Sequence, residues 1–431
     1  MTAVTAGRQR HGGTGAGMDP VVVFSGGGTG GHLYPALALA RALESSVPGL
    51  SAFFVGARRG LEARVLPQKA REHLLVPVEG FNRDRILANV GVLLNLGVSF
   101  LSVLRAFLAR RPRLVVVTGG YAAGPAGLAA AVLRIPLVIQ EQNAVPGVTV
   151  RWLARFARQI HVAFPEAAGH LPSAVRNRVR VSGNPIEPPT AVDRAEALDH
   201  FGLDPALPVV LVVGGSQGSL ALNRGVLAAV RTWEESSTAV EPRSETSGSA
   251  VPQSSSRSSE GGADRKGESA PFPPFQLLWS TGPAHIREME DALGELGSPR
   301  WVRPVAYIHG MAQALGIATL AVSRAGAMAT SEFLAWGIPS ILVPLPTAAA
   351  DHQRKNAAAL EEAGAAVLLP EDRLEGEDLL RRIQELVSDP SHLAIMTQAA
   401  RQRGRPAAAR EIAESLRVFL PDAPPEPREA S

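Results

Sequence analysis

Residues 21–44 read VVVFSGGGTGGHLYPALALARALE, and this stretch decides the fold. An apolar run is followed by five glycines, a histidine and then a segment whose apolar residues have helical spacing. This order predicts a buried strand, a tight corner and a helix. Glycine allows positive φ and lets a phosphate or sugar approach the backbone closely, so the corner is a candidate ligand site.

Strand-like apolar segments alternate with helical segments along most of the chain. The first series comprises residues 21–24, 51–56, 74–78, 114–120, 136–143, 159–164 and 179–185, and the second comprises residues 208–218, 275–282, 301–305, 318–326, 340–346 and 365–369. This alternation predicts an α/β fold with two tandem Rossmann-like, doubly wound parallel-sheet domains. Prolines in GNPIEPPT, residues 183–190, place the junction between them.

The domain boundaries follow from these series. We expect a disordered tail over 1–18, an N-terminal domain over 19–185, a linker over 186–207, a C-terminal domain over 208–390, a helical stretch over 391–420 and a tail over 421–431. Residues 234–271 are rich in Ser, Glu, Gly and Pro, which predicts a disordered insertion in the second domain. Met1 and Met18 are both candidate translation starts.

Composition excludes several classes of function. Lys and Arg total 43 against 40 Asp and Glu, so there is no basic field and we expect no nucleic-acid partner. The chain has no cysteine, which excludes disulfides and cysteine-ligated zinc and suits a cytoplasmic protein. The segment before Met18 lacks the apolar core of a signal peptide.

Two further glycine corners, in VVVTGGYAAGPAG (residues 115–127) and VVLVVGGSQGSLALN (residues 209–223), also follow predicted strands. Ligands of open α/β sheets bind at such strand ends, so the three corners predict a ligand-binding cleft. The sequence has no Walker motif, which disfavours nucleoside triphosphate hydrolysis. A dinucleotide site needs an acidic residue at the end of the second strand, and the segment there, FFVGARRG, has none, which disfavours NAD. Residues 214–218 match the hydrolase elbow G-x-S-x-G, but an elbow would not explain the corners of the first half.

Seven motifs in one order carry a family resemblance. They are GGTGGH, GGYAAGPAGLAA, EQNAVPG, SGNP, GGSQG, SRAGAMATSE and DHQRKNA. Together they resemble the MurG family of peptidoglycan N-acetylglucosaminyltransferases over about residues 20–420, without the insertion.

The resemblance implies a GT-B fold, with the lipid-linked acceptor on the N-terminal domain and UDP-GlcNAc on the C-terminal domain. Residues 391–420 would cross back to the first domain. The implied reaction is an inverting transfer of N-acetylglucosamine to the C4 hydroxyl of undecaprenyl-pyrophosphoryl-MurNAc-pentapeptide in cell-wall biogenesis. No cofactor is expected, and the absence of D-x-D and H-E-x-x-H motifs gives no support for a metal.

The resemblance also implies the location and the partners. The expected location is peripheral, on the cytoplasmic face of the cell membrane. The expected partners are both substrates and an anionic membrane surface, with other cell-wall synthesis proteins as further candidates. The alternatives are another GT-B enzyme, either a glycolipid glycosyltransferase or a UDP-GlcNAc 2-epimerase, and a non-catalytic nucleotide-sugar-binding protein.

Site residues follow motif by motif. His32 is the candidate general base, because histidine titrates near neutral pH, and its alternative role is to cap the following helix. Glu332 matches the family's ribose-binding glutamate, and its alternative is a surface position on a helix. The expected donor-binding residues are Thr29, Gly30, Gly31, Asn143, Ser216, Gln217, Gly218, Arg324, Gly326, Ala327, Glu332, Gln353 and Asn356. The expected acceptor and pyrophosphate loops contain Gly28, Thr29, Gly30, Gly31, Gly119, Gly120 and Tyr121.

One position departs from the family pattern. After SGNP the family commonly has Val or Ile and then Arg, whereas here Glu187 follows Ile186. A cationic contribution to donor binding from this position is therefore not expected.

The uncharged stretch Ile86 to Leu104 has the length of a membrane span and is flanked by arginines. It is a buried helix or helix pair, an apolar surface patch for membrane docking, or a span. We expect the docking patch to include Leu93 and Leu96.

Overall fold

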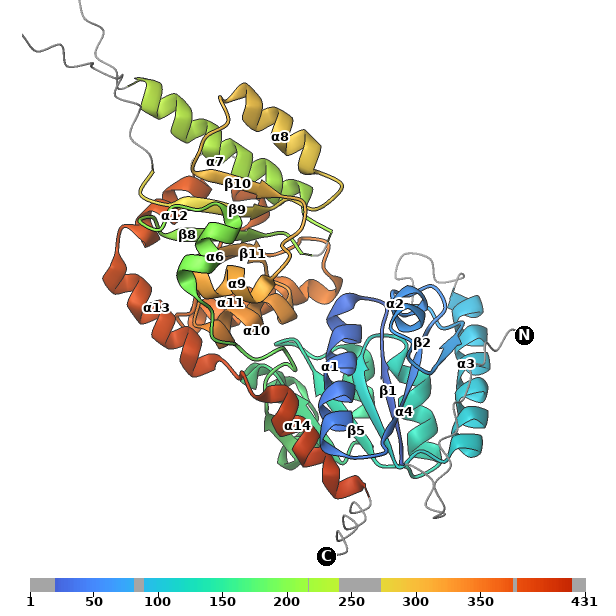
Figure 1. Ribbon diagram of the computed structural model, residues 1–431. Coiled ribbons are helices and arrows are strands. Elements are labelled where there is room, and N and C mark those ends of the chain that lie inside the picture. The colour runs from blue at the N-terminus through green and yellow to red at the C-terminus, as the bar shows by residue number, and fades with distance from the viewer. Residues whose placement is uncertain (1–19, 81–88, 216, 240–272, 375–377, 421–431) are drawn as a thin grey trace, which may run out of the picture. The chain divides into compact units, whose positions relative to one another are not determined.

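The computed structural model describes residues 20–80, 89–215, 217–239, 273–374 and 378–420 (Figure 1). The expected terminal tails, 1–18 and 421–431, therefore lie outside the described residues. Most of the expected insertion, 234–271, also lies outside them. Its first residues are described, and they form the end of helix α7 (Leu220–Ala239).

The first sheet contains seven parallel strands in the order β3-β2-β1-β4-β5-β6-β7. Their bounds are Val21–Gly26 (β1), Ser51–Ala57 (β2), His73–Val76 (β3), Leu114–Gly119 (β4), Leu137–Glu141 (β5), Gln159–Val162 (β6) and Val179–Val181 (β7). Each coincides with a predicted segment. The order reverses between β1 and β4, which is the switch point where ligands of such sheets bind.

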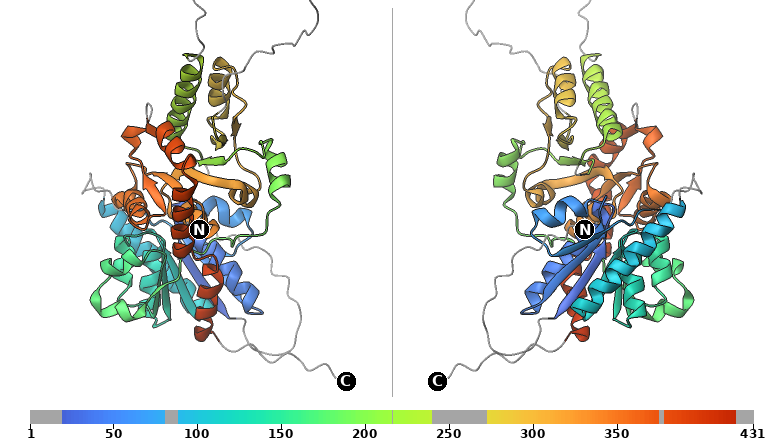
Figure 2. Two further views of the ribbon diagram at one scale, coloured as in Figure 1. Left: turned by 90° about the vertical axis from the view of Figure 1, so that its left-hand side faces the viewer. Right: turned by 90° about the vertical axis from the view of Figure 1, so that its right-hand side faces the viewer.

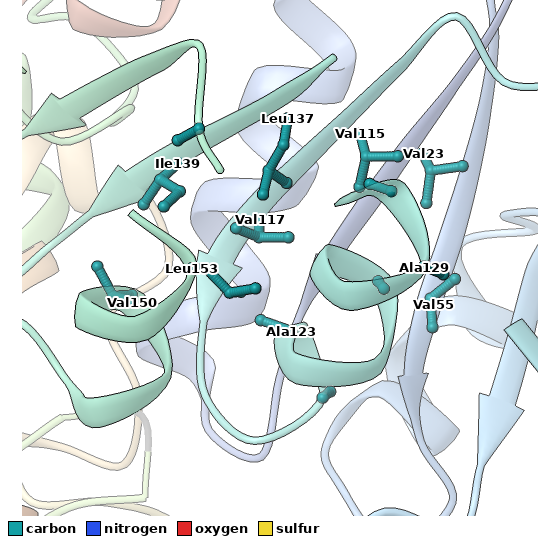
Figure 3. Close-up of a cluster of buried hydrophobic side chains, with 14 of the residues drawn as sticks. Val23, Val55, Val115, Val117, Ala123, Ala129, Leu137, Ile139, Val150 and Leu153 are labelled. Atoms are coloured by element: carbon teal, nitrogen blue, oxygen red, sulfur yellow. The ribbon is translucent and has the colours of Figure 1, made fainter. Parts of the chain in front are cut away.

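Alternate residues of these strands enter two cores, because successive side chains of a strand point to opposite faces. Val22 and Phe24 pack with helices α1 (Gly30–Ser46) and α2 (Glu62–Gln68) on one face. Val23 and Val55 pack on the other face with α3 (Asn89–Arg110), α4 (Ala123–Val132) and α5 (Val148–Leu153), as Figure 3 shows for α4 and α5. Figure 2, in its right-hand view, shows α3 in cyan across the strands.

The second sheet has six strands in the order β10-β9-β8-β11-β12-β13. Their bounds are Val209–Val213 (β8), Gln276–Ser280 (β9), Val302–Val305 (β10), Ala318–Arg324 (β11), Ser340–Val343 (β12) and Ala366–Leu368 (β13). The order repeats that of the first sheet, with the switch point between β8 and β11. The tandem doubly wound architecture predicted from the sequence is confirmed.

The remaining helices follow the alternation. They are α6 (Arg194–Phe201), α8 (Ile286–Glu295), α9 (Met311–Ile317), α10 (Ala327–Trp336), α11 (His352–Glu362), α12 (Asp378–Val387), α13 (Pro390–Arg403) and α14 (Ala408–Leu416). The expected linker thus contains a helix, α6, with Asp193 accepting hydrogen bonds from its first backbone N–H groups. The expected C-terminal helical stretch is two helices, and Ile412 and Leu416 of α14 join the core that α1 covers.

Packing divides the chain into two units. The first comprises residues 1–191, 324–368 and 395–431, and the second comprises residues 192–323 and 369–394. The division falls at the end of β11, so α10 and α11 belong to the same unit as the first sheet. The domain boundaries stated above remain a prediction.

Candidate active site at the strand ends

His32 lies in the first turn of α1, beside the end of β4. Its Nδ1 is 2.9 Å from the carbonyl oxygen of Thr118 and 2.6 Å from Oε1 of Gln142. Both oxygens can only accept, so the neutral ring carries its proton on Nδ1. Nε2 is then left with a lone pair, which a general base requires.

Two glycines at the end of β4 allow this approach. Gly119 and Gly120 have φ of 99° and 74°. A Cβ at Gly120 would collide with the carbonyl oxygen of Gly27, and one at Gly119 would lie 3.0 Å from Nδ1 of His32. The corner after β1 and the corner after β4 therefore pack backbone against backbone, with His32 held between them.

Glu62 is a site residue that the sequence reasoning missed. This buried carboxylate accepts hydrogen bonds through Oε1 from the N–H groups of Gly28 (3.0 Å) and Ala57 (3.1 Å). The Gly28 N–H therefore has a partner within the protein, whereas the sequence suggested that this loop receives a pyrophosphate. Tyr121 lies against Gly28, and burial, followed by the charges of Glu62 and Glu79, raises the pKa of its phenol.

Three buried amides extend from His32. Nε2 of Gln142 donates to Oε1 and to the carbonyl oxygen of Gln140. Nε2 of Gln140 donates to Oδ1 of Asn184 (2.9 Å). Nδ2 of Asn184 donates to Oγ of Ser331 (2.9 Å) and to the carbonyl oxygens of Ala327 and Gln142 (3.2 Å each).

Asn143 and Asn356, two of the expected donor-binding residues, are brought together by a hydrogen bond. Oδ1 of Asn356 accepts from the N–H of Ala144 (2.9 Å), and its Nδ2 donates to Oδ1 of Asn143 (3.2 Å) and to the carbonyl oxygen of Ala325 (3.3 Å). Asn356 is fully buried. Its amide thus holds the loop after β5, and contact of Asn143 or Asn356 with the donor remains a prediction.

Glu141 anchors the same loop. Its carboxylate accepts from the N–H and Nδ2 of Asn143 (2.9 and 3.1 Å) and from the N–H of Gly147 (3.3 Å). Burial raises the pKa of Glu141, while these hydrogen bonds and the nearby His32 oppose the shift.

On the second sheet, the corner after β8 packs tightly against the corner after β9. Gly218 has a φ of 79°, and a Cβ there would collide with the carbonyl oxygen of Thr281. Asn223 donates to that carbonyl oxygen (2.8 Å) and accepts from Nε1 of Trp279 (3.1 Å). Gln217 is exposed, and Ser216 lies outside the described residues.

The other expected donor residues surround the start of α10. Gly326 is its N-cap and Ala327 its first residue. Nη1 of Arg324 donates to the carbonyl oxygens of Val343 (3.3 Å) and Pro344 (3.4 Å), so this side chain bonds to the backbone after β12. Backbone N–H groups at the helix start, rather than this guanidinium, are the candidates for anion binding.

Two side chains expected at the donor sugar and nucleotide have different environments. Burial, and second the charge of Glu187, raise the pKa of Glu332 to about 7. Oε1 of Gln353 accepts from the N–H of Leu345 (3.0 Å), which fixes the orientation of its amide. Ligand contacts of both residues remain predictions.

The strand order and the two switch points are those of the GT-B fold, and the family comparisons place the chain among the glycosyltransferases. The chain matches the glycosyltransferase family 28 N-terminal domain over residues 22–162 and the family 28 C-terminal domain over residues 209–413. It belongs to glycosyltransferase family 28.

Relatives and solved structures agree with this assignment. The chain is 37% identical to the UDP-N-acetylglucosamine--N-acetylmuramyl-(pentapeptide) pyrophosphoryl-undecaprenol N-acetylglucosamine transferase of Chlorobaculum tepidum, over 92% of this chain and 98% of the relative. It is 34% identical to the transferase of the same name from Listeria monocytogenes, over 92% and 98%. The crystal structure of Acinetobacter baumannii MurG is similar with a TM-score of 0.68 at 25% identity, over 93% of this chain and 99% of that one.

Proposed function

We propose that the chain transfers N-acetylglucosamine from UDP-GlcNAc to the C4 hydroxyl of undecaprenyl-pyrophosphoryl-MurNAc-pentapeptide, with inversion at the anomeric carbon. The names of the relatives and the seven ordered motifs support the substrates. The observation that carries the chemistry is His32, whose Nδ1 faces two acceptors so that Nε2 has a free lone pair.

In this mechanism His32 takes the proton of the acceptor hydroxyl at Nε2 while the oxygen forms its bond to the anomeric carbon. The bond from that carbon to the UDP oxygen breaks, and its electron pair leaves with UDP. Backbone N–H groups at the start of α10 are proposed to face the charge that develops on the pyrophosphate. Glu332 is proposed to accept hydrogen bonds from the ribose hydroxyls.

The acceptor has an undecaprenyl chain, so the enzyme must work at a membrane surface. Within the described residues, the segment Gly91–Arg110 of α3 is long and apolar enough to cross a membrane. Its mean hydropathy is 1.9, and 22% of its most apolar part is buried. Its Val103 and Phe107 belong to the core, whereas Leu94 and Leu101 are exposed. We propose that α3 stays packed on its sheet and docks its exposed side on the cytoplasmic face of the cell membrane.

A turnover assay with UDP-GlcNAc and a lipid-linked muramoyl-pentapeptide analogue tests the proposed reaction. We expect His32→Ala to lower kcat by roughly 10²- to 10⁴-fold, with UDP affinity unchanged by calorimetry. His73→Ala is the matched control, because its Nδ1 also contacts a backbone carbonyl, that of Arg71, but it lies on β3.

The assay also separates the alternatives. Wild-type turnover by His32→Ala would reject the base assignment. Epimerised UDP-sugar as the product, or UDP binding without turnover of any acceptor, would reject the transferase.

A further inference from the structure

The network of amides beside His32 has one internally consistent orientation, and it can be derived from its far end. Nδ2 of Asn184 faces the carbonyl oxygens of Ala327 and Gln142, which can only accept. Oδ1 of Asn184 is therefore the atom presented to Gln140, and it accepts from Nε2 of Gln140.

The same argument passes along β5. Since Nε2 of Gln140 points to Asn184, its Oε1 points to Gln142, where it accepts from Nε2. The carbonyl oxygen of Gln140 also accepts from Nε2 of Gln142, at 2.9 Å. Oε1 of Gln142 is thereby directed at Nδ1 of His32, 2.6 Å away.

Burial makes this arrangement specific. Gln140, Gln142 and Asn184 are each at most 2% exposed, so water does not compete for their polar atoms. Reversing one amide would place two donors or two acceptors against each other, and each unsatisfied buried group is costly.

We propose that Gln142 is a positioning residue for His32 and that Gln140 and Asn184 hold it in place from the start of α10. The proposal rests on the proposed function, in which His32 is the general base. Nδ1 of His32 thus has two acceptors, and Oε1 of Gln142 (2.6 Å) is closer than the carbonyl oxygen of Thr118 (2.9 Å). Oε1 of Gln142 fixes the ring and stabilises the imidazolium that forms when Nε2 takes the proton. Gln142 neither touches the substrates nor transfers a proton.

The arrangement also links two parts of the site. Ala327 and Ser331, at the far end, lie on α10, the helix that carries Glu332. A shift of α10 would therefore change the hydrogen bonds of Asn184 and, through the two glutamines, the support of His32.

Two substitutions at Gln142 test the positioning role. Gln142→Met keeps the length of the side chain but removes its acceptor, and we expect kcat to fall roughly 10- to 100-fold, the range of a hydrogen bond to a charged group. KM for UDP-GlcNAc should stay within about twofold. Gln142→Glu keeps an acceptor for Nδ1 of His32 but loses the donor to Oε1 and the carbonyl oxygen of Gln140, so its kcat should lie between those of the wild type and Gln142→Met. Gln140→Met should reduce kcat as well, by a smaller factor.

Gln159→Met is the matched control. Gln159 is a buried amide on the neighbouring strand β6, and it bonds to Ser415 rather than to His32. Its loss should leave kcat unchanged.

Nitrogen-15 NMR of histidine-labelled protein supplies a readout that does not depend on turnover. The His32 resonances are assigned by their loss in His32→Ala. We expect the ring proton on Nδ1 in the wild type. The proton resonance of this N–H group should move upfield in Gln142→Met.

A proton on Nε2 in the wild type would overturn the proposal even if Gln142→Met failed to fold. Wild-type kcat and ring resonances in Gln142→Met would overturn it too. If the resonances behave as expected but His32→Ala turns over normally, the base assignment fails while the positioning of the ring stands.

Discussion

The negative charge of Glu187 acts on the buried carboxyl group of Glu332. Burial is the larger effect and this charge the smaller one, and together they raise the pKa of Glu332 to about 7. Glu187 is exposed, and its carboxylate also lies 3.3 Å from the guanidinium of Arg41. The position of Glu187 is the one where the resembled family commonly has arginine. The chain therefore has a negative charge where a positive one would favour ionised Glu332.

UDP affinity should accordingly rise with pH between about 6 and 8. Ionised Glu332 accepts from the ribose hydroxyls more strongly than the protonated carboxyl does, and at pH 6 a carboxyl with a pKa of about 7 is ionised in roughly a tenth of the molecules. Affinity at pH 6 should therefore be roughly tenfold below its plateau, as measured by calorimetry.

Two variants complete this experiment. The ionisation of UDP affects the wild type and Glu332→Gln equally, so a difference between their pH profiles comes from the carboxyl group of Glu332. Glu332→Gln should lose the pH dependence due to this group and about 1.5 to 3 kcal/mol of UDP affinity at pH 8. Glu187→Gln should shift the rise in affinity to lower pH. Parallel profiles in the wild type and Glu332→Gln would exclude Glu332 as the ribose-binding carboxylate.

Asn356 and Gln353 should separate structural from ligand-binding amides. Asn356→Ala leaves the buried N–H of Ala144 without its acceptor, so we expect the free energy of unfolding to fall by about 1 to 3 kcal/mol. Gln353→Ala should instead raise KM for UDP-GlcNAc with little loss of stability. Denaturant titrations and initial rates on both variants check this. Equal stability of the two variants would contradict the structural role of Asn356.

The sheets could be predicted because strand signals are local. Val21–Gly26 and Val209–Val213 are apolar runs ended by glycines, and nothing elsewhere in the chain is needed to recognise them. The glycine corners could be predicted as well. Gly120 and Gly218 occupy positions where a Cβ would collide with backbone, so the structure requires glycine there and the sequence displays it.

The support of His32 could not be predicted in the same way. EQN drew attention to Asn143, but Gln142 is the residue that contacts His32, and its partner Asn184 is 42 residues away. A signal was present in LVIQEQ, where Gln140 lies within the buried strand and Gln142 directly after it, at a spacing of two, so both point to one face. Buried amides need partners, but which partners they find depends on the tertiary fold.

Stability at acid pH should depend on His161. Burial, and second the charge of Arg180, lower its pKa to about 4, and its ring lies between Ser182 (2.8 Å), Gln159 (3.2 Å) and Ser415 (3.3 Å). Because the folded-state pKa is below the ordinary value of about 6.5, the unfolded state binds the proton first as pH falls.

Stability from this group is complete above about pH 6.5 and is lost as pH falls towards 4. Between pH 7 and pH 5 the loss is roughly 2 kcal/mol. His161→Gln should show a correspondingly smaller difference between urea titrations at the two pH values. An unchanged difference would exclude His161 as the source.

The expected docking patch on α3 needs one correction. Leu93 is exposed, as expected, but Leu96 packs against the core of the first sheet with Phe100 and Leu104, so a charge there would disrupt folding. Leu94 and Leu101, with exposed fractions of 68% and 58%, are the appropriate positions. They lie two helical turns apart on the side that faces away from that core.

Leu94→Glu with Leu101→Glu should therefore reduce sedimentation with anionic liposomes. The substitutions remove inserted apolar surface, worth about 0.8 kcal/mol per buried CH₂, and add charges repelled by anionic lipids. UDP affinity and the unfolding transition should stay at wild-type values, because neither side chain contributes to the core. Val148→Glu is the matched control, an exposed apolar residue (68%) at the start of α5. If the double variant sediments like the wild type, α3 is not the docking surface. If the control loses binding equally, the charge effect is not specific to α3.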